Sequence, residues 1–233
     1  MESIDKVNGT FGKRPIEQKP NVSSAVIKRL PRYHRCLGDL LRADKLRISS
    51  AELARIMDVT ASQIRQDLNC FGGFGQQGYG YNVKFLYSKI SELLGVEEGY
   101  NAVIIGAGKL GRALAATHMF ERRGVNRLAM FDVDPNVIGT KISDVPVYPI
   151  DELGEFCRTH NVHIGVLTVP KESAYDVARV IVDAGVQGIW NFANMELKLD
   201  NSDVIIENIH LGDSLMALCF AIKTAEEKRK END

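Results

Sequence analysis

Six residues near the middle of the chain have the spacing of a dinucleotide-binding loop. The segment follows an apolar strand at residues 101–105 and opens a helix. In such a loop Gly106 allows the tight turn, Gly108 lets the main chain approach a pyrophosphate, and Gly111 lets the helix pack closely on the strand. Free N–H groups at the start of the helix attract the phosphates. We therefore expect the whole loop to contact the cofactor, namely Gly106, Ala107, Gly108, Lys109, Leu110 and Gly111.

An acidic residue follows this loop at the distance that the dinucleotide fingerprint requires. Asp132 lies 21 positions after Gly111, at the end of the next predicted strand. Its carboxylate can accept hydrogen bonds from the hydroxyls of the adenosine ribose. Asp132 is followed by Val133 and Asp134 and not by an arginine, so a 2′-phosphate would meet two acids. The sequence therefore predicts NAD(H) rather than NADP(H).

Two later segments follow predicted strands at 164–169 and 188–191. In open α/β sheets, ligands bind beyond the carboxyl ends of the strands, so both segments are placed to reach the cofactor. An ordinary turn from strand to loop is the alternative for each. The remaining predicted cofactor contacts are Val133, Thr168, Val169, Pro170, Asn191 and Phe192.

The N-terminal half contains the pattern of a helix-turn-helix. A serine cap and an acid at residues 49–52 begin one helix, and Thr60 can cap a second helix at 61–71. Asn69 and four polar residues named below should be exposed on the second helix, where arginine can bond guanine and glutamine adenine. The glycine-rich segment 72–81 predicts a short hairpin that fits the wing of a winged helix. The predicted DNA contacts are Arg32, Arg55, Thr60, Ser62, Gln63, Arg65, Gln66, Gly78 and Tyr79.

The arrangement of predicted elements indicates an α/β protein with two folded domains. A first helix should start near Pro31, because proline suits the first turn of a helix. In the second half, strands alternate with helices at 109–122, 171–184 and 214–230, which is typical of a parallel Rossmann sheet. The last helix carries an apolar stripe of Leu215, Leu218, Cys219 and Ile222 that can pack on its own domain or on a partner. The predicted parts are a disordered tail at 1–21, a winged-helix DNA-binding domain at 22–95, a Rossmann domain at 96–213 and a C-terminal helix with a tail at 214–233.

Charge and composition restrict the possible partners. The chain has 233 residues and a net charge of −1, but residues 1–95 hold 15 Lys and Arg against 9 Asp and Glu. The other residues hold 14 against 21, so only the first half suits a polyanion. No secretory signal or membrane span is found, which predicts a cytoplasmic protein. The four cysteines lack metal-ligand spacing and are expected to be reduced and mostly buried.

Three other interpretations of the sequence are alternatives to a DNA-binding regulator that binds a cofactor. An NAD-dependent dehydrogenase with a helical accessory domain would need a positioned acid or base, and none of the five histidines lies in a catalytic motif. A CoA-binding module can have the same fold, although Asp132 favours NAD. Oxidation of Cys70 would be a different redox mechanism, with a buried structural thiol as its alternative. We therefore predict no catalytic residue and no metal site.

Taken in order, these segments resemble the Rex family of bacterial redox-sensing transcriptional repressors. The resemblance begins near Val22 and covers nearly all of the chain after it. It implies a homodimer that exchanges its C-terminal helix between subunits and binds a near-palindromic operator while NADH is low. It also implies release of the operator when NADH rises, with NAD(H) sensed and not consumed. The segments that carry it are Val59–Leu68, Phe71–Gly72, Gly78–Tyr81, Gly106–Gly111, Phe131–Pro135, Leu167–Pro170 and Asn191–Ala193.

The chain also departs from the family pattern. It has Gln66 where the family commonly has lysine, and Gln76 and Gln77 where the wing is commonly basic. The family often has tyrosine at the position of Thr117 and aspartate at the position of His210, and both take part in the NADH-linked change of domain orientation. Proline often follows the Asn-Phe-Ala segment, where this chain has Asn194. We therefore expect a divergent member with candidate switch positions at Thr117 and His210.

Overall fold

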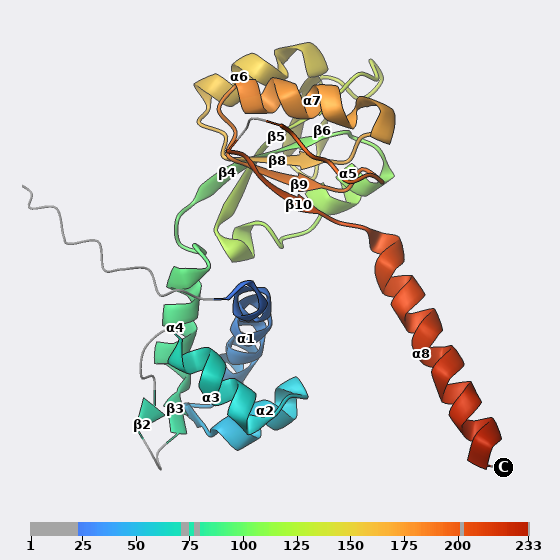
Figure 1. Cartoon of the computed structure of the whole chain (residues 1–233). Helices are drawn as coiled ribbons and strands as arrows, with labels where there is room; N and C mark the ends of the chain where they lie inside the picture. Colours follow the sequence, from blue (N-terminus) through green and yellow to red (C-terminus); the bar gives the residue numbers. More distant parts are fainter. Residues whose placement is uncertain (1–22, 71–74, 77–79, 201–202, 233) are drawn as a thin grey trace, which may run out of the picture. The chain divides into compact units, whose positions relative to one another are not determined.

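The computed structural model describes residues 23–70, 75–76, 80–200 and 203–232. The chain forms two compact units, Met1–Leu94 and Gly95–Asp233. Each has its own buried core. Figure 1 shows the helices and strands of both units.

The first unit is a winged helix-turn-helix. Its short antiparallel sheet has the strand order β1-β3-β2, and the core is formed by apolar side chains of the helices, β1 and β3. The β2–β3 pair confirms the expected hairpin for the described residues, whereas Gly78 and Tyr79 lie outside them. Its elements are α1 (Ser24–Arg42), β1 (Arg47–Ile48), α2 (Ser50–Met57), α3 (Ala61–Asn69), β2 (Gly75–Gln76), β3 (Gly80–Asn82) and α4 (Val83–Leu93).

Helix α1 starts earlier than its proline predicts. It begins at Ser24 after the cap Ser23, whose hydroxyl accepts a hydrogen bond from the N–H of Val26, and Pro31 lies inside it. The predicted start near Pro31 is wrong. The hydrogen bond lost at the proline costs less free energy than is gained by burying the side chains on its N-terminal side. Val26 and Leu30 are both buried there.

Helix α3 agrees with its cap signal but ends sooner than expected. The Thr60 hydroxyl accepts a hydrogen bond from the N–H of Gln63 at 3.1 Å, and Ile64 and Leu68 point into the core. The helix ends at Asn69 and not at Phe71, which lies outside the described residues.

The second unit is a doubly wound Rossmann sheet. Its strand order is β10-β9-β8-β4-β5-β7-β6, parallel throughout except for β6 at one edge. Without β6 this is the order of a dinucleotide-binding fold, whose ligand crevice lies where the strand order reverses, between β4 and β8. The strands are β4 (Tyr100–Ile105), β5 (Val125–Asp132), β6 (Lys141–Ile142), β7 (Val145–Pro149), β8 (Ile164–Leu167), β9 (Gly188–Asn191) and β10 (Ile205–Asn208).

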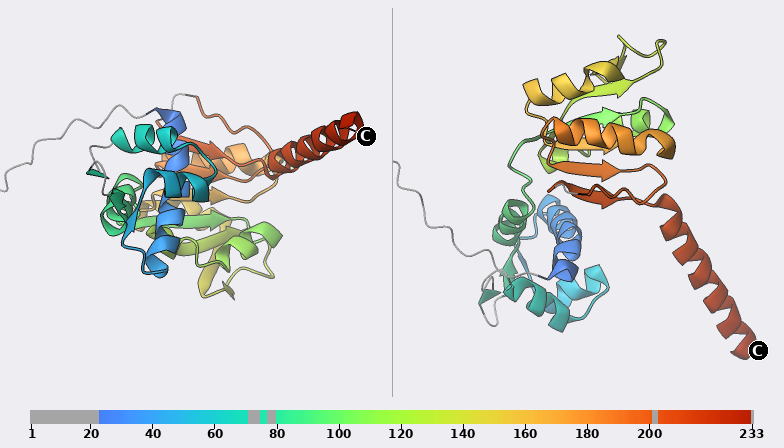
Figure 2. Two further views of the ribbon diagram at one scale, coloured as in Figure 1. Left: turned by 90° about the horizontal axis from the view of Figure 1, so that it is seen from below. Right: turned by 45° about the horizontal axis from the view of Figure 1, so that its top comes forward.

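Alternate residues of the central strands face two different cores. Val103 and Ile105 pack with α6 (Leu153–Thr159) and α7 (Lys171–Asp183), whereas Ile104 packs with Ala115 of α5 (Lys109–Ala115). The views of Figure 2 agree with α6 and α7 on one face of the sheet. This two-sided burial explains why residues 102–105 of β4 form an unbroken apolar run.

Helix α5 is shorter than the predicted 109–122. It ends at Ala115, where the Arg127 guanidinium from β5 donates to the Ala115 carbonyl in place of a further helical N–H. A separate 3₁₀ turn follows at Glu121–Arg123. A contact from a distant strand therefore ends this helix, and no local sequence signal marks it.

Helix α8 and the cysteines also differ from expectation. Helix α8 spans Leu211–Asn232, three residues longer at its start than predicted, and its apolar side chains are exposed in the single chain. All four thiols are free, but only Cys157 is buried, so the expectation of mostly buried cysteines is wrong. Burial raises the pKa of Cys157 to about 11, whereas Cys70 is exposed. None of the described helices is long and apolar enough to cross a bilayer.

Candidate functional site

The three loop glycines have three different surroundings. Gly106 has φ +100°, and a Cβ there would lie 2.7 Å from the Thr168 carbonyl oxygen. A Cβ on Gly111 would lie 1.9 Å from the Gly106 oxygen, so no side chain fits between helix and loop. A Cβ on Gly108 would have no protein neighbour within 4 Å. These are the turn, the helix packing and the open approach that a bound pyrophosphate requires.

Asp132 is fixed at the end of β5 by main-chain donors. Its Oδ1 accepts from the N–H groups of Val133 at 2.7 Å and Asp134 at 2.9 Å, and its Oδ2 accepts from the Ala107 N–H. Each carboxylate oxygen offers two acceptor sites, so Oδ2 keeps one for another donor. The carboxylate therefore joins the strand to the glycine loop and can still accept from a hydroxyl.

A pocket of about 490 Å³ lies over this loop, within the range of small-molecule sites. Two of its lining residues, Arg112 and Val137, were missed from the sequence. Arg112 lies one helical turn after Gly108, and its Nε donates to the Ala107 oxygen at 2.7 Å. Helical spacing from the loop would have found Arg112, but Val137 has no such signal. The pocket is lined by Ala107, Gly108, Lys109, Arg112, Asp132, Asp134 and Val137.

The segment after β8 borders the glycine loop but not the pocket. The Thr168 hydroxyl lies 2.8 Å from the Gly106 oxygen and 3.0 Å from the Ile105 oxygen, so it holds the loop against β8. Val169 packs on the core, and Pro170 precedes the first turn of α7.

The segment after β9 is further removed from the pocket. Asn191 is fully buried, and its Nδ2 donates to the Met195 oxygen at 3.0 Å and to Asn208 Oδ1 at 2.8 Å. Its Oδ1 accepts from the Ala193 N–H at 3.0 Å. Phe192 packs against the Trp190 ring at 4.6 Å between centroids. The Asn191 side chain is thus committed inside the protein.

The two candidate switch positions have separate partners. Thr117 lies beyond the end of α5 and donates from its hydroxyl to the Leu114 oxygen at 2.9 Å. His210 Nε2 lies 3.0 Å from Glu196 Oε1. Within the described part of the chain, no hydrogen bond or ion pair joins Thr117 to His210.

In the first unit, α3 presents a polar face opposite its buried side. Ser62, Arg65, Gln66 and Asn69 are exposed, as predicted, but Gln63 is half-buried. Arg65 Nη1 donates to the Ser50 hydroxyl at 3.2 Å, which steadies it beside the start of α2.

The two arginines predicted outside α3 lie on neighbouring helices. The Arg32 guanidinium, on α1, donates to the Met57 carbonyl at the end of α2. Arg55 is exposed near the end of α2. Arg32 and Arg55 therefore lie along the helix-turn-helix, together with Thr60 at the start of α3.

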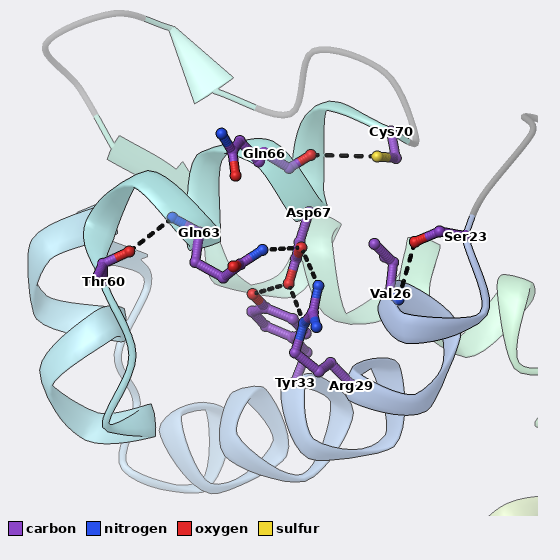
Figure 3. Close-up of polar contacts among 9 residues, drawn as sticks. All are labelled: Ser23, Val26, Arg29, Tyr33, Thr60, Gln63, Gln66, Asp67 and Cys70. Atoms are coloured by element: carbon purple, nitrogen blue, oxygen red, sulfur yellow. Dashed lines mark hydrogen bonds and ion pairs between the residues drawn. The ribbon is translucent and has the colours of Figure 1, made fainter.

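A buried carboxylate joins α3 to α1 (Figure 3). Asp67 is 1% exposed and forms a two-point ion pair with Arg29, both bonds being 2.7 Å. It also accepts from the Tyr33 hydroxyl at 2.9 Å and from Gln63 Nε2 at 2.8 Å. Burial alone would raise the pKa of Asp67, but these hydrogen bonds outweigh burial and lower it. No sequence pattern marks this cluster, because its members are far apart along the chain.

Comparison with known proteins covers nearly the whole chain. Two family models match, one described as a CoA binding domain (residues 97–195) and one as the N-terminus of a putative DNA-binding protein (residues 21–69). The redox-sensing transcriptional repressor Rex of Clostridium botulinum (strain Alaska E43 / Type E3) is 51% identical over 207 residues, which is 89% of this chain and 98% of the relative. The Rex of Caldanaerobacter subterraneus subsp. tengcongensis is 50% identical over 211 residues, 91% of this chain and 94% of the relative.

Solved structures agree with these relatives. RSP in complex with β-NAD⁺ and operator DNA has a TM-score of 0.83 and 50% identity, covering 90% of this chain and 96% of RSP. RSP in complex with β-NADH has a TM-score of 0.82 and 47% identity, covering 90% of this chain and 98% of RSP. RSP is described as a Rex-family repressor.

Fold and site together define a DNA-binding regulator with a dinucleotide-binding Rossmann unit. The similarity covers about nine tenths of the chain and therefore includes both units. The chain belongs to the Rex family of redox-sensing transcriptional repressors. This places it among transcription regulators and rejects the dehydrogenase alternative.

Proposed function

We propose that this chain is a transcriptional repressor that binds operator DNA when NADH is low and releases it when NADH is high. The observation that carries this is the match, over nine tenths of the chain, to one repressor solved with β-NAD⁺ and operator DNA and also with β-NADH. Its action belongs in the cytoplasm, where the operator and the nicotinamide pool are both accessible.

NAD(H) is the cofactor, and its adenosine end occupies the pocket at the glycine loop. Gly108 and the start of α5 receive the pyrophosphate, Lys109 and Arg112 add positive charge, and Asp132 accepts from the ribose. Thr168 supports the loop, and Val169 and Pro170 lie beyond the carboxyl end of β8, toward the crevice. Bound NAD(H) reports the redox state by its occupancy and oxidation level.

DNA contacts belong to residues 22–95 and centre on α3. Ser62, Gln63, Arg65 and Gln66 reach base edges. Thr60 orients the helix as its cap. Arg32, Arg55 and the wing residues Gly78 and Tyr79 contact phosphates or the adjacent groove. The excess of basic residues in this half supports the assignment.

The active species is a homodimer that pairs through residues 214–233. Exposed Leu215 and Leu218 on α8 supply an apolar surface that a second copy covers, as the family resemblance implies. Two copies then place two α3 helices on the two halves of a near-palindromic operator.

Thr117 and His210 occupy the positions that link cofactor to DNA in the family. Because both differ from the family pattern, we propose a changed response to NADH relative to NAD⁺. The cofactor loop itself retains every glycine that the dinucleotide fingerprint requires.

The test is selection of bound DNA from a random pool, followed by titration of the selected operator with NADH and with NAD⁺. We expect one enriched near-palindrome, released by NADH at lower concentration than by NAD⁺. Failure to enrich any DNA in either condition would reject the repressor function. Strong NADH-selective release, indistinguishable from that of a relative with the usual tyrosine and aspartate, would show that the Thr117 and His210 substitutions are immaterial.

A further inference from the structure

The Asp67 carboxylate has all its acceptor positions filled. Oδ1 receives Arg29 Nη2 and Gln63 Nε2, whereas Oδ2 receives Arg29 Nε and the Tyr33 hydroxyl. A carboxylate has about four lone-pair sites, so each of these donors is needed. Because Asp67 is buried, losing one donor costs more than it would at the surface.

This carboxylate dictates the orientation of the Gln63 amide. An ionised carboxylate only accepts hydrogen bonds, so the amide must turn its nitrogen, and not its oxygen, toward Asp67. Arg29 keeps Asp67 ionised, because its guanidinium holds the pKa of the carboxyl below its usual value. Gln63 is therefore a donor on its inner side.

The other amide atom is left for an outside partner. Gln63 Oε1 accepts no hydrogen bond among the described residues, and within that part of the chain no buried side-chain oxygen lacks a partner. Oε1 must then be reached by solvent. Gln63 is also the third residue of α3 and so lies near its N-terminal end. That is the end at which a recognition helix contacts bases.

We infer that Asp67 is a positioning residue that fixes Gln63 as a pure acceptor toward DNA and thereby sets the base preference at one position of each half-site. The inference rests on the proposed operator binding. A free glutamine reads adenine with two bonds, one from its nitrogen and one to its oxygen. With the nitrogen held by Asp67, only the acceptor remains.

A lone acceptor in the major groove distinguishes bases in a characteristic way. Adenine offers its N6 amino group and cytosine its N4 amino group, whereas guanine and thymine present acceptors at the corresponding edge. Gln63 should therefore tolerate adenine or cytosine on the contacted strand and disfavour guanine or thymine. We expect about tenfold weaker binding for guanine or thymine, with adenine and cytosine within about threefold of each other.

The experiment uses the full-length protein and operators in which each half-site position is varied. Gln63→Met should flatten the preference at the position that Gln63 contacts and leave the others unchanged. Gln66→Met is the matched control, since Gln66 is exposed on the next turn and should affect a different position.

Asp67→Asn adds a second measurement, the base preference at this position, which would not change if Asp67 only stabilised the fold. A neutral side chain at position 67 releases the Gln63 amide, so the base preference at that position should narrow to adenine. The preference is measured at temperatures where circular dichroism shows the variant folded. If that variant does not fold, the base preference of the unmodified protein and its change in Gln63→Met still decide.

Two results would overturn the inference: adenine alone accepted by the unmodified protein at the position that Gln63→Met flattens, or no position altered by Gln63→Met. Absence of any DNA binding by the unmodified protein would instead reject the proposed function.

Discussion

At the scale of single residues, the cofactor loop illustrates how one motif combines independent physical needs. Gly111 serves the protein itself, because its missing side chain allows α5 to touch the Gly106 carbonyl. Gly108 has no protein neighbour that requires it and φ −72°, a value that alanine readily adopts. Its lack of a side chain is therefore explained by the ligand and not by the fold.

Alanine at these two positions should separate folding from binding. Gly108→Ala should leave the thermal midpoint of the second unit nearly unchanged but weaken NADH binding about tenfold or more, because its Cβ occupies the approach of the pyrophosphate. Gly111→Ala should destabilise that unit by about 2–4 kcal/mol through a clash with main chain. Thermal unfolding and NADH titration of both variants provide the measurements. Equal loss of stability in the two would contradict this separation.

Residues of the site were predictable where the signal is local. The loop glycines and Asp132 belong to one fingerprint, and Gly108 and Asp132 line one pocket. The surroundings of Gln63 and Asn191 were not predictable, because Asp67 is itself held by Arg29, 38 positions away, and Asn191 by Asn208, 17 away. Sequence pattern shows residue types, whereas these contacts depend on tertiary structure.

At the scale of elements, α1 and α3 are joined by the ion pair of Arg29 and Asp67. The folded state depresses the pKa of Asp67 from its ordinary 3.8. The resulting stability is therefore fully present above pH 3.8 and is lost as the pH falls through the lower, folded value. This makes the recognition helix sensitive to acid.

The acid sensitivity can be tested with Asp67→Asn. At neutral pH we expect this change to destabilise the first unit by about 2 kcal/mol, since Arg29 loses its charged partner. The difference between the two proteins should shrink as the pH falls below about 4. Hydrogen exchange of the α1 and α3 amides, corrected for its intrinsic pH dependence, measures this. A constant difference across that range would count against the carboxylate as its origin.

Elements with strong periodicity and caps were predicted well, and those ended by tertiary contacts were not. Ser49 and Thr60 cap their helices as expected. β7 and α6 were not predicted. β7 contains two prolines in Val145–Pro149, which argue against a strand, yet it pairs with β5 near the sheet edge. α6 has only seven residues. Tertiary contacts therefore formed a strand where the local sequence argues against one, and ended α5 earlier than its local pattern predicts.

At the scale of the whole molecule, the exposed apolar side chains of α8 are the clearest unsatisfied feature. Leu215 is 62% and Leu218 is 56% exposed in the single chain. Continuous apolar surface of this kind is usually covered by a partner. The second copy of the proposed homodimer would cover this surface and would also supply a second DNA-binding unit.

A charge on this helix should prevent pairing. Leu218→Asp should weaken dimerisation about a hundredfold or more, because the carboxylate would be buried without a partner. Binding to a two-half-site operator should fall with it, since the second contact is no longer intramolecular. Light scattering and operator titration measure both. Arg229→Asp, a charge change in the polar end of α8, is the control, and an unchanged dimer in Leu218→Asp would exclude this helix as the interface.

The pair of amides formed by buried Asn191 of β9 and half-buried Asn208 of β10 determines how these two strands align. Asn191 lies directly opposite Asn208, and the two amides bond at 2.8 Å. If the edge strand β10 slipped along β9 by two residues, its apolar pattern would still face the same way, but the Asn191 amide would be buried beside Ile206. That mismatch costs roughly 1–3 kcal/mol for each unpaired group. The pair therefore selects one register for the last strand, and this register determines the point at which the chain leaves the sheet to begin α8.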